Sequence, residues 1–333
     1  MGSSTSRAIV TGVGSFVPNN VLRNSDLEKM VDTSNEWILE RTGVRERRIL
    51  PRDQATSDMA TAAARKALEC AGRGPADVDL IIVATVTPDM VFPSASCLVQ
   101  RNLGAGRAAA FDVGAACSGF LYAMATAASF IEAGCYRTVL VIGAETLSRI
   151  TDWTDRATCV LFGDGAGAVV LEAANRSGDD RGILGWCLGA DGTGWDTLMQ
   201  PAGGSRMPAS EETVAQRLHT IKMNGNQVFK FAVRAMGNAV NECLEKCGLT
   251  HADIDLLIPH QANTRIIESA STRFKIPLEK IAVNIDRYGN MSSASIPVAL
   301  DEAVRSGRLE KGDTVVMVAF GGGLTWAAMT LRW

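Results

Sequence analysis

The pattern of apolar and polar positions repeats along this chain. Residues 57–84 read as an amphipathic helix, a glycine that ends it and a short apolar strand, Leu80–Ala84. Residues 231–259 show the same order of helix, glycine and apolar strand. The letters ADVDL at Ala76 return as ADIDL at Ala252, 176 residues later. This repeat predicts two segments of similar structure.

A second pair of matching segments keeps the same spacing. The strand-like TVLVIG begins at Thr138 and TVVMVA begins at Thr314, again 176 residues apart. Two matches with one offset predict a duplicated α/β unit, with chance similarity of two α/β segments as the alternative. A period of this length excludes a solenoid of short repeats. We therefore expect two halves, residues 1–175 and 176–333, each with helices around a largely buried sheet.

Composition and charge narrow the class of protein. Of the 333 residues, 47% are hydrophobic and 21% charged, as in globular proteins, and the formal net charge of −3 argues against a nucleic-acid binder. The run 113–131 carries no charge, but its many alanine, glycine and hydroxyl residues favour a buried helix over a membrane span. The first ten residues contain no signal-peptide core, so we expect a cytoplasmic chain.

The eight cysteines are expected to be reduced thiols, because their spacing fits no zinc pattern and the setting is cytoplasmic. Most should be small core residues, among them Cys70, Cys97, Cys159 and Cys187. Cys117 differs, since it lies among Gly and Ala at the start of a long apolar segment. A helix that begins just after it would point free N–H groups at the sulfur and lower the thiol pKa. A buried, inert cysteine is the alternative.

Two further polar residues can complete a reactive site with this thiol. His260 follows the apolar strand LLIP, at a strand end where α/β proteins bind ligands, although a structural core histidine remains the alternative. Asn290 lies in the second-half loop that corresponds to the loop of Cys117, and a turn or helix-capping residue is its alternative reading.

A thiol, an imidazole and a carboxamide together indicate carbon–carbon bond formation on thioesters. The thiolate takes an acyl group, and the other two side chains donate to one carbonyl oxygen and so stabilise an enolate. Backbone N–H groups of Cys117 and of the glycine turn 321–323 can form an oxyanion hole.

Long, ordered motifs surround these residues. They are AACSGF around Cys117, PHQAN around His260, YGNMSSASIP around Asn290, and further along the chain FGGGLTW, DTSNEWILERTGVRERR, FPSASC and TDRATCVLFGDGAGAVVLE. These motifs closely resemble those of β-ketoacyl-acyl-carrier-protein synthase III, a family of the thiolase superfamily, and the likeness covers nearly the whole chain. The resemblance implies a thiolase-like α/β fold with duplicated halves, mixed sheets and a five-layered α-β-α-β-α arrangement.

The resemblance further implies an enzyme that initiates fatty-acid biosynthesis. An acyl-CoA primer, acetyl-CoA or similar, would acylate Cys117. His260 and Asn290 would then drive the decarboxylation of malonyl-acyl-carrier protein and its Claisen condensation with the acyl group. The oxyanion hole would use the amides of Cys117 and Gly322. No metal and no cofactor is implied, since the coenzyme A thioester is a substrate.

Residues around the mouth of the site also match the family. The resemblance places the coenzyme A nucleotide against Trp37, Arg41 and Arg156, because an indole can stack on adenine and guanidinium groups bind phosphate. It places the acidic carrier protein against Lys230 and Arg265, whose positive charge would steer an anionic partner.

Phe92 would reach the acyl pocket of the partner subunit in the homodimer that the family implies. The chain departs from the most compact members in 195–219, where Pro, Gly and Ser clusters predict a lengthened loop near the acyl or phosphopantetheine entrance. The choice of primer, acetyl, branched or longer, therefore stays open. A related condensing enzyme of secondary metabolism, with another acyl donor or acceptor, is the alternative function.

Other functions fit the motifs less well. A chain-elongating synthase would carry a histidine in place of Asn290, and a degradative thiolase would carry a second cysteine in its C-terminal glycine turn. The glycines of 11–16 and 162–170 suggest a nucleotide-binding oxidoreductase, but Val17 and Val170 stand where the dinucleotide motif requires its third glycine.

Overall fold

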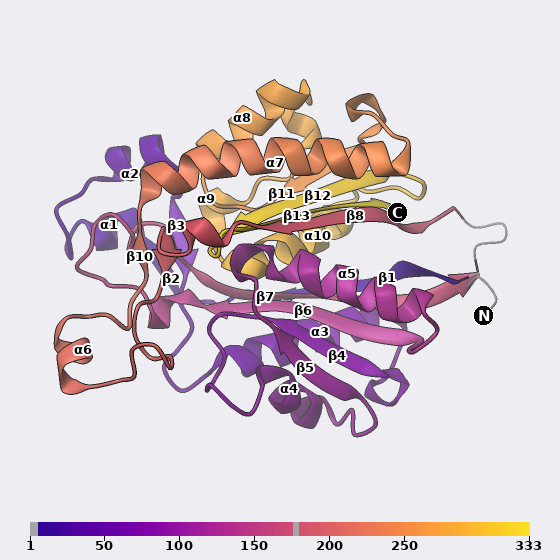
Figure 1. The fold of residues 1–333 in the computed structure, drawn as a ribbon, viewed down its shortest axis with the longest axis horizontal. Helices are drawn as coiled ribbons and strands as arrows, with labels where there is room; N and C mark the ends of the chain where they lie inside the picture. The colour runs from indigo at the N-terminus through magenta and orange to yellow at the C-terminus, as the bar shows by residue number, and fades with distance from the viewer. Residues whose placement is uncertain (1–5, 176–179) are drawn as a thin grey trace.

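The computed structural model describes residues 6–175 and 180–333, so residue 176, where we expect the second half to begin, lies outside the described residues. The first half forms a five-stranded mixed sheet (Figure 1). In order across the sheet, its strands are β1 (Ser6–Phe16), β7 (Asp164–Asn175), β6 (Thr138–Thr146), β4 (Leu80–Ala84) and β5 (Ala109–Val113). Strand β4 runs parallel to β5 and β6, whereas β7 runs antiparallel to β1 and β6.

The second half forms a four-stranded mixed sheet. Its order is β11 (Leu256–Pro259), β12 (Thr314–Gly321), β13 (Thr325–Arg332) and β8 (Gly182–Ala190). Strands β11 and β12 are parallel, and the other two pairings are antiparallel.

Helices form three layers around the two sheets (Figure 1). The outer layer on the first sheet consists of α3 (Thr56–Ala71) and α4 (Ala95–Leu103), and the outer layer on the second sheet of α7 (Gly225–Cys247) and α8 (Thr264–Phe274). Between the sheets lie α5 (Gly119–Glu132) and α10 (Ser295–Arg305), each in contact with strands of both sheets. This confirms the predicted five-layered α-β-α-β-α arrangement.

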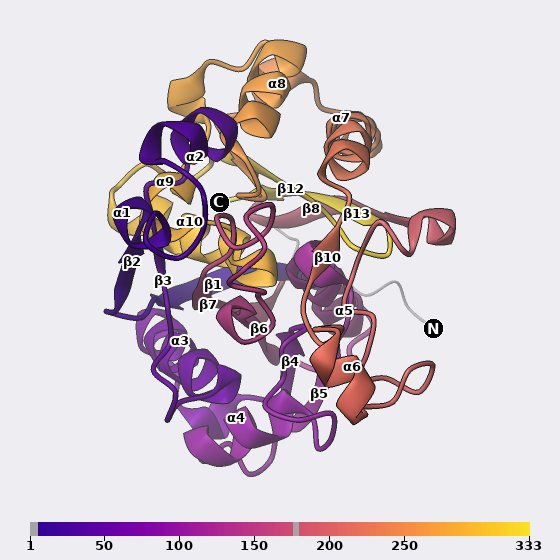
Figure 2. The same ribbon diagram turned by 90° about the vertical axis from the view of Figure 1, so that its left-hand side faces the viewer.

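Short elements gather at one end of the layers, on the left of Figure 1 and facing the viewer in Figure 2. Here α1 and α2 lie on one side and α6 on the other. The elements are β2 (Val21–Arg23), α1 (Asn24–Leu27), α2 (Asn35–Thr42), β3 (Glu46–Arg48), β9 (Leu198–Met199), α6 (Glu211–Ala215), β10 (Lys222–Met223) and α9 (Ile285–Tyr288). The segment predicted as a lengthened loop, 195–219, thus carries β9 and α6, and β9 pairs with β10.

The predicted duplication is present in the elements themselves. Strands β4 and β11, strands β6 and β12, and helices α5 and α10 each begin 176 residues apart. The one-turn 3-10 helices before α5 and α10, Ala116–Ser118 and Ser292–Ala294, keep the same offset. Even the backbone angle is repeated, because φ is +46° at both Ala116 and Ser292. Such agreement in local geometry leaves no role for chance similarity.

The uncharged run 113–131 is explained by the position of α5 in the middle layer. Phe120, Leu121 and Met124 are fully buried there, and burial of each such side chain stabilises the fold by about 1.5–3 kcal/mol. Alanines between them allow α5 to pack closely against both sheets. Among residues 6–175 and 180–333, no helix combines the length and hydropathy that a bilayer crossing requires.

The turn before α10 packs directly on β6. A Cβ atom at Gly143 of β6 would lie 2.3 Å from the carbonyl oxygen of Ser293, which only a glycine avoids. This close approach brings a second-half turn against the first-half sheet, next to the residues discussed below.

The expectation for the cysteines is correct only in part. All eight are free, and Cys159 and Cys187 are buried as predicted. Cys70 and Cys97 are exposed instead, because they lie on the solvent faces of the outer helices α3 and α4.

Candidate active site

One cavity brings together the three side chains singled out in the sequence. Cys117 from the first half and His260 and Asn290 from the second half all line it, and its volume is about 210 Å³. We call it the triad cavity. A second hollow of about 180 Å³, here called the apolar hollow, also reaches Cys117. Its walls are mainly hydrophobic and include Leu147, Ile150, Phe162, Leu198, Met199 and Ile221.

Cys117 lies in the one-turn helix that leads into α5, at a tight bend of the backbone. The positive φ of Ala116 is a conformation that non-glycine residues rarely adopt and that clusters at functional sites. The turn of β12 approaches closely, since a Cβ atom at Gly321 would lie 2.7 Å from the Cys117 nitrogen. A side chain at position 321 would therefore collide with the backbone of Cys117, which explains the glycine there.

The expected lowering of the Cys117 thiol pKa is wrong for this structure. The sulfur does precede a helix, but burial raises the pKa of the Cys117 thiol to about 12. The physical reason is that a thiolate would lose its hydration in the closed site. Cys117 is thus a neutral thiol at rest, and it would need a proton acceptor in order to act as a nucleophile.

His260 follows β11 and is almost completely buried. Its backbone N–H donates to the Val318 carbonyl oxygen at 2.8 Å, and its ring meets Phe320 edge-on with centroids 5.4 Å apart. Neither ring nitrogen has a hydrogen-bond partner among the described residues. Burial lowers the pKa of His260 to about 3, so the ring is neutral and both nitrogens are free to serve a substrate.

The backbone and side chain of Asn290 are both held in place. Its N–H donates to the Leu161 carbonyl oxygen at 2.9 Å, and its own carbonyl accepts from the Gly163 N–H at 3.0 Å. The side-chain oxygen Oδ1 accepts from the Ser292 N–H at 2.8 Å. Because the oxygen is occupied, the amide NH₂ is the group left to donate into the cavity.

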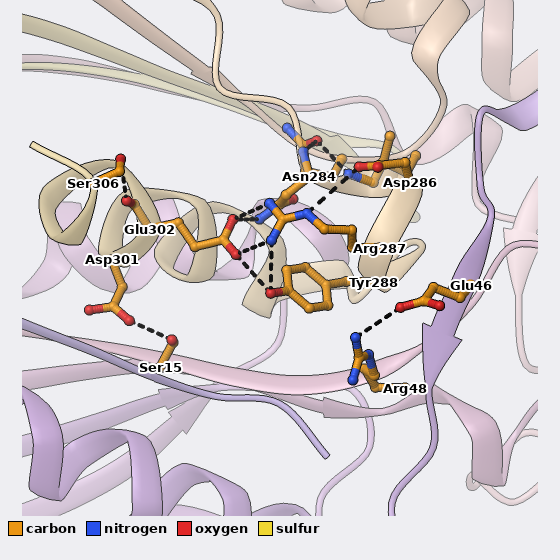
Figure 3. A network of polar contacts seen from close by, with 12 residues as sticks. Ser15, Glu46, Arg48, Asn284, Asp286, Arg287, Tyr288, Asp301, Glu302 and Ser306 are labelled. Carbon is orange, nitrogen blue, oxygen red and sulfur yellow. Dashed lines mark hydrogen bonds and ion pairs between the residues drawn. The ribbon is translucent and has the colours of Figure 1, made fainter. Parts of the chain in front are cut away.

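A polar network anchors the helix that precedes Asn290 (Figure 3). Arg287 forms a bidentate pair with Glu302 of α10 at 2.8 and 2.9 Å. Tyr288 and Asn284 donate to the same carboxylate at 2.7 and 2.9 Å. Such a bidentate, partly buried pair is stronger than an ordinary surface ion pair. Helix α9 is thereby fixed to α10, which sets the position of the 289–290 turn.

The glycine turn after β12 lies beside the nucleophile. Gly322 and Cys117 line the apolar hollow together. Thr325 Oγ1 donates within the same turn and lies 3.1 Å from the Ala115 carbonyl and 3.2 Å from the Gly322 carbonyl. This hydroxyl ties the glycine turn to the backbone just before Cys117, consistent with a shared oxyanion hole.

Two arginines lie against Trp37 at the mouth of the triad cavity. The guanidinium carbons of Arg41 and Arg156 lie 5.0 and 4.7 Å from the indole centroid. Trp37 and Arg41 line the cavity directly, and Arg156 donates to the Asp32 carbonyl oxygen at 2.7 Å. The three residues predicted for the coenzyme A nucleotide therefore form one cluster.

Both predicted carrier-protein residues are neighbours of residues that line the same cavity. Lys230 is exposed on α7, directly after Val228 and Phe229, which line the cavity. Arg265 is exposed on α8, and its guanidinium lies 5.4 Å from the Phe229 ring centroid. Phe92 is different, because it does not line the cavity of its own chain and its side chain is 83% exposed.

Sequence reasoning missed most of the walls of the site. Leu198 lines both spaces, Met199 lines the apolar hollow, and Phe162 and Phe320 line the triad cavity. The repeat held one unused signal: Ser293 stands 176 residues after Cys117, and it is a buried polar residue of the second-half turn.

Comparison with known proteins agrees with the motifs. The chain matches 3-oxoacyl-[acyl-carrier-protein (ACP)] synthase III over residues 111–192 and the C-terminal part of the same synthase over 244–333. It is 61% identical over 324 residues to the β-ketoacyl-[acyl-carrier-protein] synthase III of Caldanaerobacter subterraneus subsp. tengcongensis, and 57% identical over 324 residues to that of Desulfitobacterium hafniense, with 97% of each chain covered.

A solved structure shows the same likeness in three dimensions. The crystal structure of 3-oxoacyl-[acyl-carrier-protein] synthase III from Aquifex aeolicus matches with a TM-score of 0.89 at 49% identity, covering 98% of this chain and 100% of the other. The chain therefore belongs to the β-ketoacyl-acyl-carrier-protein synthase III family of condensing acyltransferases, as its motifs predicted.

Proposed function

We propose that this chain initiates fatty-acid biosynthesis by condensing an acyl-CoA primer with malonyl-acyl-carrier protein through an acyl-Cys117 intermediate. The observation that carries the proposal is the meeting of Cys117, His260 and Asn290 in one cavity. A nucleophile and two hydrogen-bond donors around one space are what acyl transfer followed by enolate chemistry requires.

In the first half-reaction the Cys117 sulfur attacks the thioester carbonyl of the primer. The new carbon–sulfur bond forms, the bond to the coenzyme A sulfur breaks, and the thiol proton leaves with coenzyme A. His260 lines the same cavity as Cys117 and can carry this proton between the two sulfur atoms. The developing oxyanion accepts from the amides of Cys117 and Gly322. The acyl chain then lies in the apolar hollow, whose size suits a short primer.

In the second half-reaction malonyl-carrier protein replaces coenzyme A. The neutral His260 ring and the Asn290 NH₂ donate to the malonyl thioester oxygen while the bond to the carboxylate breaks and carbon dioxide leaves. The resulting enolate carbon attacks the acyl-Cys117 carbonyl, forms the new carbon–carbon bond and releases the sulfur, which regains a proton. Neither half-reaction uses a metal or a redox group.

The surface around the mouth supports the proposed docking of both substrates. Trp37, Arg41 and Arg156 offer one aromatic face and two guanidinium groups to an adenine nucleotide with phosphates. Lys230 and Arg265 offer exposed positive charge to an acidic carrier protein. These proposed substrates would place the reaction in the cytoplasm.

We also propose that the chain acts as a homodimer. Strand β5 is at the edge of its sheet, where backbone groups are available to a second chain. Met90, Val91 and Phe92 expose apolar side chains just before α4, and such a patch is typical of an interface. In a dimer, Phe92 would be free to enter the partner's acyl site.

We further propose that each chain is divided into two halves at 175/176. The strands support this division, since the last strand of the first sheet ends at Asn175 and the first strand of the second sheet begins at Gly182.

Intact-protein mass spectrometry after exposure to a mixture of acyl-CoA thioesters tests the proposal. We expect one acyl group per chain, placed on Cys117 by peptide mapping, and the preferred mass identifies the primer. A Cys117→Ala variant should remain unmodified and make no condensation product, whereas Cys97→Ala, a change at an exposed thiol, should behave as the parent. Normal condensation by Cys117→Ala would reject the assignment of the nucleophile.

A further inference from the structure

Glu145 is a buried carboxyl group that the mechanism does not use. It lies near the end of β6 and is completely buried. Its carboxyl oxygens contact the Thr87 hydroxyl at 2.6 Å, the Val86 N–H at 3.1 Å and the Thr85 hydroxyl at 3.3 Å. From the other half, the Ser293 hydroxyl lies 3.0 Å away. Among the described residues no cation lies within ion-pair distance of Glu145, which is unusual for a buried carboxyl group.

The internal repeat gives this position a meaning. Shifted by 176 residues, Glu145 corresponds to Gly321 and Ser293 corresponds to Cys117. In the second half Gly321 packs against the backbone of Cys117, where a Cβ atom would collide with the Cys117 nitrogen. In the first half Glu145 stands against Ser293 and is hydrogen-bonded to it. The side chain of Glu145, next to Ser293, therefore occupies the position that corresponds to Gly321, which has no side chain and lies next to Cys117.

The hydrogen-bond geometry around Glu145 accommodates a protonated carboxyl group. The Ser293 hydroxyl has one proton but two oxygen neighbours, the Ala84 carbonyl at 2.8 Å and Glu145 Oε1 at 3.0 Å. When the proton goes to the nearer carbonyl, Oε1 can bond to Ser293 only by donating, which requires a protonated carboxyl group. Burial, which raises the pKa of Glu145, favours the same state.

The Cys117 thiol is close enough to Glu145 for a charge on the carboxyl group to raise the thiol pKa. The other groups packed against the carboxyl group, from the loop after β4 and the turn before α10, are hydroxyls and a backbone N–H. A carboxylate at Glu145 would repel a thiolate at Cys117. A neutral carboxylic acid forms the same hydrogen bonds without that repulsion.

We propose that Glu145 is a positioning residue, held as a neutral carboxylic acid, that joins the two halves behind the nucleophile. It connects the loop of Val86, which lines the apolar hollow, to Ser293. The N–H of the preceding residue, Ser292, holds the Asn290 side chain. Loss of this connection would displace the wall of the hollow and the Asn290 turn together. The inference rests on the proposed role of Cys117.

Three variants test this role: Glu145→Gln, Glu145→Ala and, as a matched control, Asp301→Asn, which changes a buried acid between α10 and β1. The first measurement is the rate of Cys117 acylation at saturating acyl-CoA, together with the half-saturating concentration. The second is the rate of iodoacetamide alkylation of Cys117 as a function of pH. Glutamine is the informative change, because its amide accepts and donates as the neutral acid does.

We expect Glu145→Gln and the control to keep the parent acylation rate and the parent alkylation profile. Glu145→Ala should lower the acylation rate by about tenfold or more, because displaced reacting groups lose rate steeply, with the half-saturating concentration unchanged. A Glu145→Gln alkylation profile displaced to lower pH by about one unit would show that the parent carries a carboxylate there, and would overturn the proposal.

Parent-like acylation by Glu145→Ala would likewise overturn it. If the alanine variant does not fold, the glutamine variant decides alone. Absence of acyl-Cys117 in the parent itself would reject the proposed function, while the alkylation profiles would still report the charge of Glu145.

Discussion

At the scale of single residues, the site depends on hydrogen bonds that leave particular atoms free. Asn290 gives its side-chain oxygen to the Ser292 N–H and so keeps its NH₂ for the substrate. His260 keeps both ring nitrogens unpartnered. The Asn290 NH₂ and the His260 ring thus line a cavity shared with a neutral thiol. Both are placed to stabilise negative charge that would develop on a substrate there.

Replacement of Asn290 tests the division of labour between the two half-reactions. Asn290→Asp keeps the shape and the bond to Ser292 but removes the NH₂ donor. We expect malonyl decarboxylation to fall by about 10²–10³-fold, as for loss of one donor to an oxyanion, while acylation of Cys117 continues. Release of carbon dioxide and intact mass measure the two steps, with the exposed Asn102→Asp as control. Loss of acylation with unchanged decarboxylation would contradict the assignment.

The depressed pKa of His260 predicts an unusual pH dependence. The ring is neutral down to about pH 3, so decarboxylation should show no titration near 6.5, the ordinary value for histidine. The unfolded chain binds a proton at this residue below 6.5, whereas the native chain binds it only near 3. The native state therefore loses stability as the pH falls between these values. Carbon dioxide release and denaturant unfolding across this window test both statements, and a rate inflection near 6.5 would contradict them.

At the scale of elements, helices and turns from both halves bring these residues to one end of the sheets. Helix α5 begins just after Cys117, β11 ends at Pro259 directly before His260, and α9, fixed to α10 through Glu302, sets the turn of Asn290. The β9–β10 ribbon adds Leu198 to the wall. The exposed cations of α7 and α8 are neighbours in sequence of Phe229 and Ile266, which line the same cavity.

A charge reversal on α8 tests the role of these cations. Arg265→Glu should weaken condensation with malonyl-carrier protein, mainly by slowing association, because rim charges act on the encounter of the partners. Acylation of Cys117 by acyl-CoA should change little. The ratio of the two rates at low and high salt is the measurement, and Lys311→Glu, in the turn before β12, is the control. An equal fall in both rates would argue against carrier-protein docking.

At the scale of the whole molecule, two similar halves enclose one working site. The repeat places Gly321 beside Cys117 and the Glu145 carboxyl group beside the equivalent residue, Ser293. Only the position beside Cys117 can therefore admit a substrate. The outer edge of the first sheet, β5, and the exposed residues 90–92 then face away from the core.

A polar change in this exposed patch tests the proposed dimer. Val91 is 89% exposed, so Val91→Lys should leave the folded chain intact while it opposes burial of the patch. We expect the sedimentation coefficient to change from that of a dimer to that of a monomer. Leu278→Lys, at an exposed apolar residue of the second half, should leave the association unchanged. A parent chain that sediments as a monomer would reject the dimer.

The sequence by itself determined the repeat and the order of helix and strand in the repeated segments, and it singled out Cys117, His260 and Asn290 as candidates, because apolar periodicity and motif spacing are local properties of the chain. Only the tertiary structure decided the protonation of the site. Burial raises the pKa of the Cys117 thiol, contrary to the expectation from the helix N-terminus, and desolvation depends on residues distant in sequence. For the same reason, the exposure of Cys70, Cys97 and Phe92 and the pairing of Glu145 with Ser293 depend on how the layers pack.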